Sequence, residues 1–150
     1  VNLQGDEPLI KPDSIDAVAR NVQEDEKADI STLIRVLKTE EEINNPNLVK
    51  CVIDNNGFAM YFSRSKIPYE RNTGVATFYG HLGIYGYKRE ALLKMTSLPQ
   101  TPLEKTESLE QLRALENGMK IKTSVVDFVP VGIDTLEDLE KFKQIVSSKL

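Results

Sequence analysis

Two acidic residues follow glycines at the ends of short apolar runs, and this arrangement constrains the fold more than any other feature of the sequence. The first run begins at Val1 and leads through Gly5 directly into Asp6. The second acid, Asp134, follows Val131-Gly132-Ile133 and precedes a helical pattern. In open α/β sheets, ligands gather at the carboxyl ends of strands. Two carboxylates placed there could hold one Mg²⁺, whose remaining ligands are substrate phosphates and water.

Each of these acids also has an ordinary structural interpretation. Asp134 is followed three residues later by Glu137, which is the spacing of a helix N-cap with its capping-box partner. The segment around Asp6 is typical of a turn in which the carboxylate binds its own backbone. A capping carboxylate can still offer its second oxygen to a metal, so the two interpretations of Asp134 are compatible.

Length and composition indicate one globular domain with restricted choices of partner. The 150 residues suit a single domain, and the net charge of −4 argues against non-specific nucleic-acid binding. The only cysteine, Cys51, cannot form an intrachain disulfide, which predicts a reducing, cytoplasmic location. The sequence has neither a run of about 18 apolar residues nor a signal-peptide pattern, so no membrane insertion is expected.

The order of hydrophobic patterns predicts a mixed α/β domain. Helices are expected from Pro12 to the charged run at 24–27, over a short turn at 39–42, and at 88–95, 101–117 and from 134 onward. Strands are expected at 29–37, 48–53, 58–62, 81–87 and 121–128. We therefore predict a mainly parallel sheet flanked by helices, with an antiparallel hairpin insertion around residues 54–57.

Other polar positions are candidates for ligand binding, although each has a structural alternative. His81 and Tyr85 share one face of a predicted strand, where a lone histidine is more often a packed core residue. Arg64 follows a strand and could bind a carboxylate or phosphate in bidentate fashion, or be an ordinary surface charge. Glu110 and Gln111 lie inside a predicted amphipathic helix, where a flanking polar pair is unremarkable on its own.

Five sequence blocks, taken in order, resemble the CMP-Kdo synthetase family, the 3-deoxy-manno-octulosonate cytidylyltransferases. The blocks are Gln4-Gly5-Asp6-Glu7-Pro8; Tyr61-Phe62-Ser63-Arg64 with Ile67-Pro68; His81-Leu82-Gly83-Ile84-Tyr85-Gly86-Tyr87; Pro102-Leu103-Glu104 with Leu109-Glu110-Gln111-Leu112-Arg113; and Gly132-Ile133-Asp134-Thr135 with Glu137-Asp138-Leu139. Together they span essentially the whole chain.

The resemblance implies an α/β nucleotidyltransferase fold, a homodimer, and Mg²⁺-dependent transfer of CMP from CTP to 3-deoxy-manno-octulosonate (Kdo). The products would be pyrophosphate and CMP-Kdo for lipopolysaccharide biosynthesis. By position, Asp6 and Asp134 correspond to the family's metal-binding, catalytic aspartates. Residues matching the Kdo pocket are Gln4, Arg64, His81, Tyr85, Glu110 and Gln111, with Arg71 as a further candidate. Arg and His would hold the Kdo carboxylate, while Tyr, Gln and Glu would bind its hydroxyls.

The sequence departs from the family at its start. Members begin with a Gly-rich and basic nucleotide-binding loop, whereas this chain does not begin with Met and opens inside a predicted strand. We therefore expect residues 1–150 to be the C-terminal part of a longer cytidylyltransferase domain. Two alternatives stay open: a cytidylyltransferase for another acidic sugar such as sialic acid, and a non-catalytic sugar-binding, metal-binding or dimerisation fragment. The block from His81 to Tyr87 favours Kdo, and residues 48–95 are the expected dimer surface.

Overall fold

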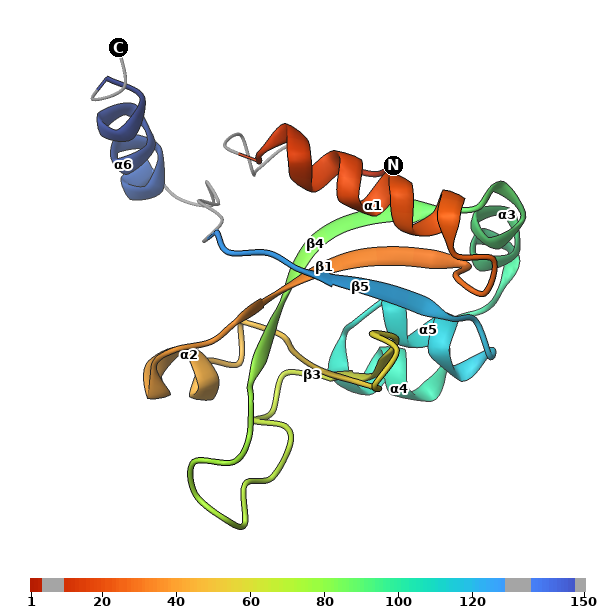
Figure 1. Cartoon of the computed structure of the whole chain (residues 1–150), viewed down its shortest axis with the longest axis horizontal. Helices are drawn as coiled ribbons and strands as arrows, with labels where there is room; N and C mark the ends of the chain where they lie inside the picture. The colour runs from red at the N-terminus through yellow and green to blue at the C-terminus, as the bar shows by residue number, and fades with distance from the viewer. Residues whose placement is uncertain (4–9, 129–135, 148–150) are drawn as a thin grey trace.

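The computed structural model describes residues 1–3, 10–128 and 136–147, which form a sheet flanked by helices (Figure 1). The helices are α1 (Pro12–Glu24), α2 (Glu40–Asn44), α3 (Arg89–Ser97), α4 (Pro102–Glu107), α5 (Gln111–Glu116) and α6 (Leu136–Ser147). The strands are β1 (Ile30–Val36), β2 (Lys50–Ile53), β3 (Ala59–Ser63), β4 (Tyr79–Tyr87) and β5 (Ile121–Val125). Within these ranges no helix combines the length and apolar character needed to cross a membrane.

The five strands form one sheet in the order β3-β2-β4-β1-β5. This confirms the mixed α/β class and the antiparallel β2–β3 hairpin. The parallel share is smaller than we predicted, because among the described strands only β1 and β5 pair in parallel. The reason is the path of β4, which runs back between β1 and β2 and is antiparallel to both. Strand β2 runs in the direction of β1 but is separated from it by β4, so the parallel pairing comes from β5, which follows three helices.

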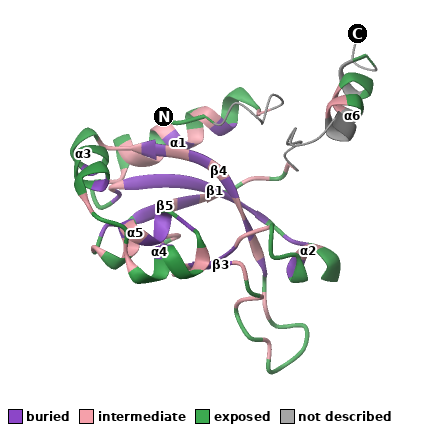
Figure 2. Ribbon diagram, turned by 180° about the vertical axis from the view of Figure 1, so that it is seen from behind, coloured by how far each residue is buried: buried purple, intermediate pink, exposed green. Residues whose placement is uncertain are grey.

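Helix α1 covers one face of the sheet. Its buried Val18 packs with Leu33 of β1 and with Leu82 and Ile84 of β4. The approach is close at Gly86, where an added Cβ would lie 2.6 Å from the Val18 carbonyl oxygen. Figure 2 shows the resulting burial of the strands and the exposure of the outer helix faces.

The opposite face of the sheet carries the larger core cluster. Ile30 and Ile34 of β1 and Ile121 of β5 pack there against Leu112 of α5 and Met95 of α3. Alternate residues of β1 thus face the two cores, as a strand buried on both sides requires. This second face is also where α3, α4 and α5 bring polar side chains close to β4.

The predicted single helix at 101–117 is wrong, since the structure has two short helices, α4 and α5. Half of the expected N-terminal capping box forms a hydrogen bond: Glu104 Oε2 accepts the Thr101 backbone N–H at 3.2 Å, whereas Thr101 Oγ1 has no partner among the described residues. The break lies at Ser108, whose φ of 53° and ψ of 50° place it in the left-handed region. Glu104 turns inward to pair with Arg113 of α5, and Leu109 and Leu112 enter the core. Tertiary packing therefore outweighs the local tendency to continue one helix.

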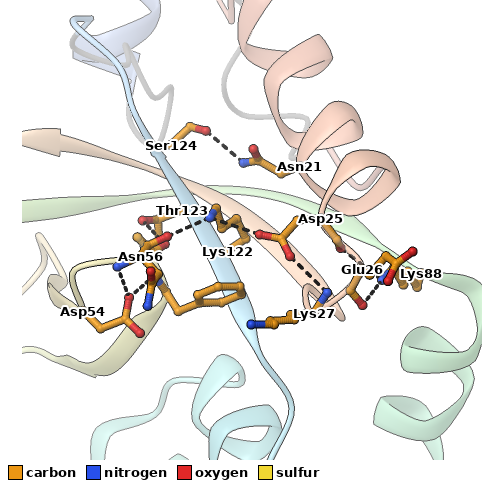
Figure 3. Close-up of polar contacts among 12 residues, drawn as sticks. Asn21, Asp25, Glu26, Lys27, Asp54, Asn56, Lys88, Lys122, Thr123 and Ser124 are labelled. Carbon is orange, nitrogen blue, oxygen red and sulfur yellow. Dashed lines mark hydrogen bonds and ion pairs between the residues drawn. The ribbon is translucent and has the colours of Figure 1, made fainter.

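Hydrogen bonds connect the β2–β3 turn to β5 at the other edge of the sheet, so the sheet is curved. Thr123 of β5 donates its backbone N–H to the Gly57 carbonyl oxygen over 2.8 Å. Lys122 Nζ donates to the Asn56 carbonyl oxygen (2.7 Å) and pairs with Asp25 Oδ2 at 3.1 Å (Figure 3). The same ammonium lies 4.6 Å from the centre of the Phe58 ring. These contacts join the end of α1, the β2–β3 turn and β5.

Candidate functional site

A row of ring side chains lies along one face of β4. Residues at even positions, from Gly80 to Gly86, are buried in the sheet, while the odd positions face the other way. The His81 and Tyr85 rings have centroids 5.4 Å apart, and those of Tyr85 and Tyr87 are 5.9 Å apart. The prediction that His81 and Tyr85 share one face is confirmed, and Tyr87 extends the row.

His81 is held as a neutral imidazole. Burial lowers its pKa from 6.5 to about 4, so the ring carries no charge at neutral pH. Its Nε2 lies 2.9 Å from the Thr32 hydroxyl, which donates to the Ile84 carbonyl oxygen at 2.8 Å. Because a hydroxyl has one proton and a carbonyl can only accept, Nε2–H must be the donor to Thr32. Nδ1 is then left as an acceptor, which suits a ligand hydroxyl better than a ligand carboxylate.

A small cavity of about 60 Å³ lies between β4 and the start of α5. Its lining residues are Asn2, Ile30, Tyr85, Tyr87, Met95, Glu110 and Gln111. The predicted site residues Tyr85, Glu110 and Gln111 are therefore brought together from positions far apart in sequence. Asn2 joins them because its backbone exchanges two hydrogen bonds with Tyr85, of 2.7 and 3.2 Å.

The side chains that line this cavity can donate and accept hydrogen bonds, which is the chemistry needed to bind hydroxyl groups. Burial raises the pKa of Tyr85 strongly, and burial followed by the charge of Glu110 raises that of Tyr87 to about 12. Both phenols therefore stay protonated and can donate hydrogen bonds. Gln111 offers a buried amide and Glu110 an exposed carboxylate. The cavity is far smaller than the 300–1,000 Å³ typical of ligand pockets, so it fits only part of a sugar.

Arg64 lies at the end of β3, beside the turn that joins α4 to α5. Its Nε donates to the Glu107 carbonyl oxygen at 2.8 Å, and its two terminal nitrogens donate to carbonyl oxygens of Pro46 and Ser108. Ser108 is two residues before Glu110, so Arg64 is linked to the cavity through that turn. Arg71, the further candidate, is exposed in the segment between β3 and β4.

The remaining predicted site residues, Gln4, Asp6 and Asp134, lie outside the described residues. Within the ranges that are described, no group of three or more His, Cys, Asp or Glu side chains is placed to hold a metal ion. The predicted Mg²⁺ site thus rests on Asp6 and Asp134 alone. As a donor set, two carboxylates fit the oxygen ligands that Mg²⁺ prefers.

A larger surface pocket, of about 390 Å³, lies away from all of these residues. It is lined by Asp25, Lys27, Asp54, Asn56, Phe58, Lys120 and Lys122. Several of its polar groups already form hydrogen bonds or ion pairs that connect the β2–β3 turn, β5 and the end of α1 (Figure 3). Asp54, for example, uses Oδ1 to accept the backbone N–H groups of Asn56 and Phe58. Size alone therefore does not mark this pocket as the functional site.

Sequence reasoning missed two residues that shape the site. Tyr87 lines the cavity and was not among the predicted site residues, although the alternation of the strand places it on the same face as Tyr85. Thr32 orients His81 from the neighbouring strand β1. No sequence signal pointed to Thr32, since its role depends on the pairing register in which Thr32 lies opposite Tyr85.

Comparison with known proteins gives consistent matches. Residues 1–121 match the cytidylyltransferase family. The chain is 48% identical to a 3-deoxy-manno-octulosonate cytidylyltransferase of Fusobacterium nucleatum over 141 residues, which cover 94% of this chain and 58% of the relative. It is 49% identical to the enzyme of the same name from Thermodesulfovibrio yellowstonii over 146 residues, covering 93% and 57%.

A solved structure gives the same picture at the level of the fold. It is the structure of a CMP:2-keto-3-deoxy-manno-octonic acid synthetase complexed with CTP. The superposition has a TM-score of 0.93 at 38% identity and covers 99% of this chain and 61% of the other. This chain therefore spans about three fifths of the length of the proteins it matches.

Proposed function

Because the chain belongs to the cytidylyltransferase family, we propose that the protein containing it transfers CMP from CTP to Kdo. The products are CMP-Kdo and pyrophosphate, and CMP-Kdo would serve lipopolysaccharide biosynthesis. The observation that carries this proposal is the cavity between β4 and α5. It gathers Tyr85, Glu110 and Gln111 in a chain whose relatives are named for activity on this sugar.

In the proposed reaction, the anomeric hydroxyl of Kdo attacks the α-phosphorus of CTP. A P–O bond to the sugar forms, the bond to the bridging oxygen of the β-phosphate breaks, and the hydroxyl proton is released. A divalent cation, when bound, neutralises phosphate charge and aligns the nucleophile with the leaving group. Asp6 and Asp134 are the residues that we propose to hold Mg²⁺.

The described side chains would bind and orient the sugar. Tyr85 and Gln111 donate to sugar oxygens, while Glu110 and the free Nδ1 of His81 accept from sugar hydroxyls. Arg64 supplies the positive charge for the Kdo carboxylate, because His81 is neutral. Fixing the nucleophile in this way can account for much of the rate. Gln4 is proposed for the same pocket on the resemblance alone.

We also propose a cytoplasmic homodimer. The support is a group of exposed apolar side chains in the segment expected to form the dimer surface, namely Met60, Tyr69, Val75, Leu92 and Leu93. Sedimentation of the full-length protein at twice its chain mass supports this assembly. Sedimentation at the mass of one chain contradicts it.

The activity is tested by measuring pyrophosphate release from CTP and Mg²⁺ with either Kdo or sialic acid as the acceptor. We expect release with Kdo and little with sialic acid. Asp6→Asn should lower the rate by about a hundredfold or more, as loss of one transition-state electrostatic group commonly does. Asp16→Asn, at an exposed position of α1, is the matched control and should leave the rate unchanged.

Three results would contradict parts of this proposal. If pyrophosphate is released faster with sialic acid than with Kdo, Kdo is not the acceptor sugar. Kdo binding without pyrophosphate release would favour a non-catalytic fragment. Kdo-dependent release that is insensitive to Asp6→Asn would remove Asp6 from the metal site.

A further inference from the structure

Two cations and one carboxylate meet where β2, β3 and the end of α4 come together. Lys50 of β2 is fully buried, and its Nζ donates to the carbonyl oxygens of Asn45 and Leu48, both at 2.7 Å. Arg64 follows β3, whose Ser63 lies opposite Lys50 in the strand pairing. Glu107, the last residue of α4, is the carboxylate that contacts this corner.

The two oxygens of Glu107 have different partners. Oε1 accepts the Ser63 hydroxyl at 2.7 Å, and Oε2 accepts the backbone N–H of Arg64 at 3.0 Å. Ser63 is only 2% exposed, so the first bond is shielded from water. The carboxylate therefore fixes the backbone at the point where β3 ends and the Arg64 side chain begins.

The Arg64 guanidinium is held by the same corner. Three of its five N–H donors reach carbonyl oxygens, of Glu107, Pro46 and Ser108, at 2.8, 3.2 and 3.4 Å. Among the described residues no acceptor contacts the other two N–H groups, and two is the number needed to bind a carboxylate in bidentate fashion. The charges of Lys50, Arg64 and Glu107 sum to one positive charge, which matches a ligand with a single carboxylate.

We propose that Glu107 is a positioning residue for acidic-sugar binding, acting through Arg64. By fixing the Ser63–Arg64 backbone against α4, it holds the guanidinium so that its remaining donors meet the ligand's carboxylate. The inference rests on the proposed function, because it takes Arg64 to be the carboxylate-binding residue. It adds a role for a residue that does not itself touch the sugar.

The test is the Kd for Kdo in the full-length protein, measured by calorimetry without CTP, for wild type, Glu107→Gln and a control. The amide keeps the shape of Glu107 but removes the negative charge that strengthens its hydrogen bonds to Ser63 and Arg64. We expect the Kd for Kdo to rise by about tenfold, the usual effect of losing one shielded hydrogen bond. In the turnover assay, the KM for Kdo should rise similarly, while the KM for CTP stays unchanged.

Glu42→Gln is the matched control. Like Glu107, the Glu42 carboxylate accepts hydrogen bonds at both oxygens: from the backbone N–H groups of Lys38 and Thr39, and from the buried guanidinium of Arg35. Glu42→Gln should lower the melting temperature about as much as Glu107→Gln does, without changing the Kd for Kdo. If Glu107→Gln does not fold, Ser63→Ala, which removes one donor to the same carboxylate, should raise the Kd about threefold.

The outcomes separate this inference from the proposed function. Equal Kd values for Kdo in wild type, Glu107→Gln and Ser63→Ala would overturn the positioning role, even if wild type releases pyrophosphate. A rise in Kd of the same size in Glu42→Gln would overturn it as well, because the effect would then be general loss of stability. Wild-type protein that binds Kdo but releases no pyrophosphate would contradict the proposed transfer reaction alone. Failure of wild type to bind Kdo would overturn both.

Discussion

At the residue scale, the site is built from groups whose protonation is fixed by burial. Tyr85 and Tyr87 remain protonated phenols and His81 remains a neutral imidazole at physiological pH. The reason is that all three side chains are partly buried, and burial disfavours their charged forms. Neutral groups of this kind bind hydroxyls through directional hydrogen bonds and not through net charge. Of the charged groups, Glu110 is exposed and Arg64 is half-buried.

The state of His81 gives a prediction for pH. The folded protein keeps its imidazole neutral down to about pH 4, whereas the unfolded chain binds a proton near pH 6.5. Since the unfolded state then binds more protons, the free energy of unfolding should fall as pH decreases from about 6.5 to about 4. His81→Gln should remove this part of the pH dependence.

The prediction can be checked directly by NMR, because His81 is the only histidine in the sequence. Its ring carbon resonance should stay constant from pH 8 to pH 5 and move only near pH 4. A titration midpoint at 6.5 would mean that the ring is solvated, and the assignment of Nε2–H to Thr32 would lose its support.

At the element scale, the break between α4 and α5 is the feature that shapes the site. It allows Glu104 to pair with Arg113 while Leu109 and Leu112 enter the core and Gln111 faces the cavity. The break depends on one residue with positive φ, Ser108. Its two flanking helices are only six residues each, so neither has much stability of its own.

Substitution at Ser108 should reveal this conformational requirement. Ser108→Val places a β-branched residue at positive φ, and it should lower the free energy of unfolding by about 1–2 kcal/mol. Ser108→Gly suits the left-handed region and should leave stability unchanged or slightly higher. Urea unfolding of both variants is the measurement. Equal destabilisation by both would show that the Ser108 side chain, rather than its backbone conformation, matters.

At the scale of the whole molecule, local sequence patterns predicted the elements better than their assembly. The amphipathic spacing of α1 and the turn residues at 54–57 were sufficient to place that helix and the β2–β3 hairpin. We overestimated the number of parallel strand pairs, because strand order depends on contacts between distant segments. The path of β4 between β1 and β2 has no local signal.

The same distinction holds for the site. Periodicity alone indicated that His81 and Tyr85 share a strand face, and the rings are indeed neighbours. That Glu110 and Gln111 meet Tyr85 followed from family resemblance and not from spacing, because the break at Ser108 decides which way Gln111 faces. The role of Glu107 could not be predicted, since its partners Ser63 and Arg64 are more than 40 residues away in sequence.

The central claim is that the cavity between β4 and α5 binds part of an acidic sugar. The most direct test is to titrate ¹⁵N-labelled protein with Kdo and map the backbone amide shifts. We predict that the largest changes cluster at Tyr85, Tyr87 and Gln111. Changes concentrated instead around Lys27, Asp54 and Lys122, which line the larger pocket, would contradict the claim.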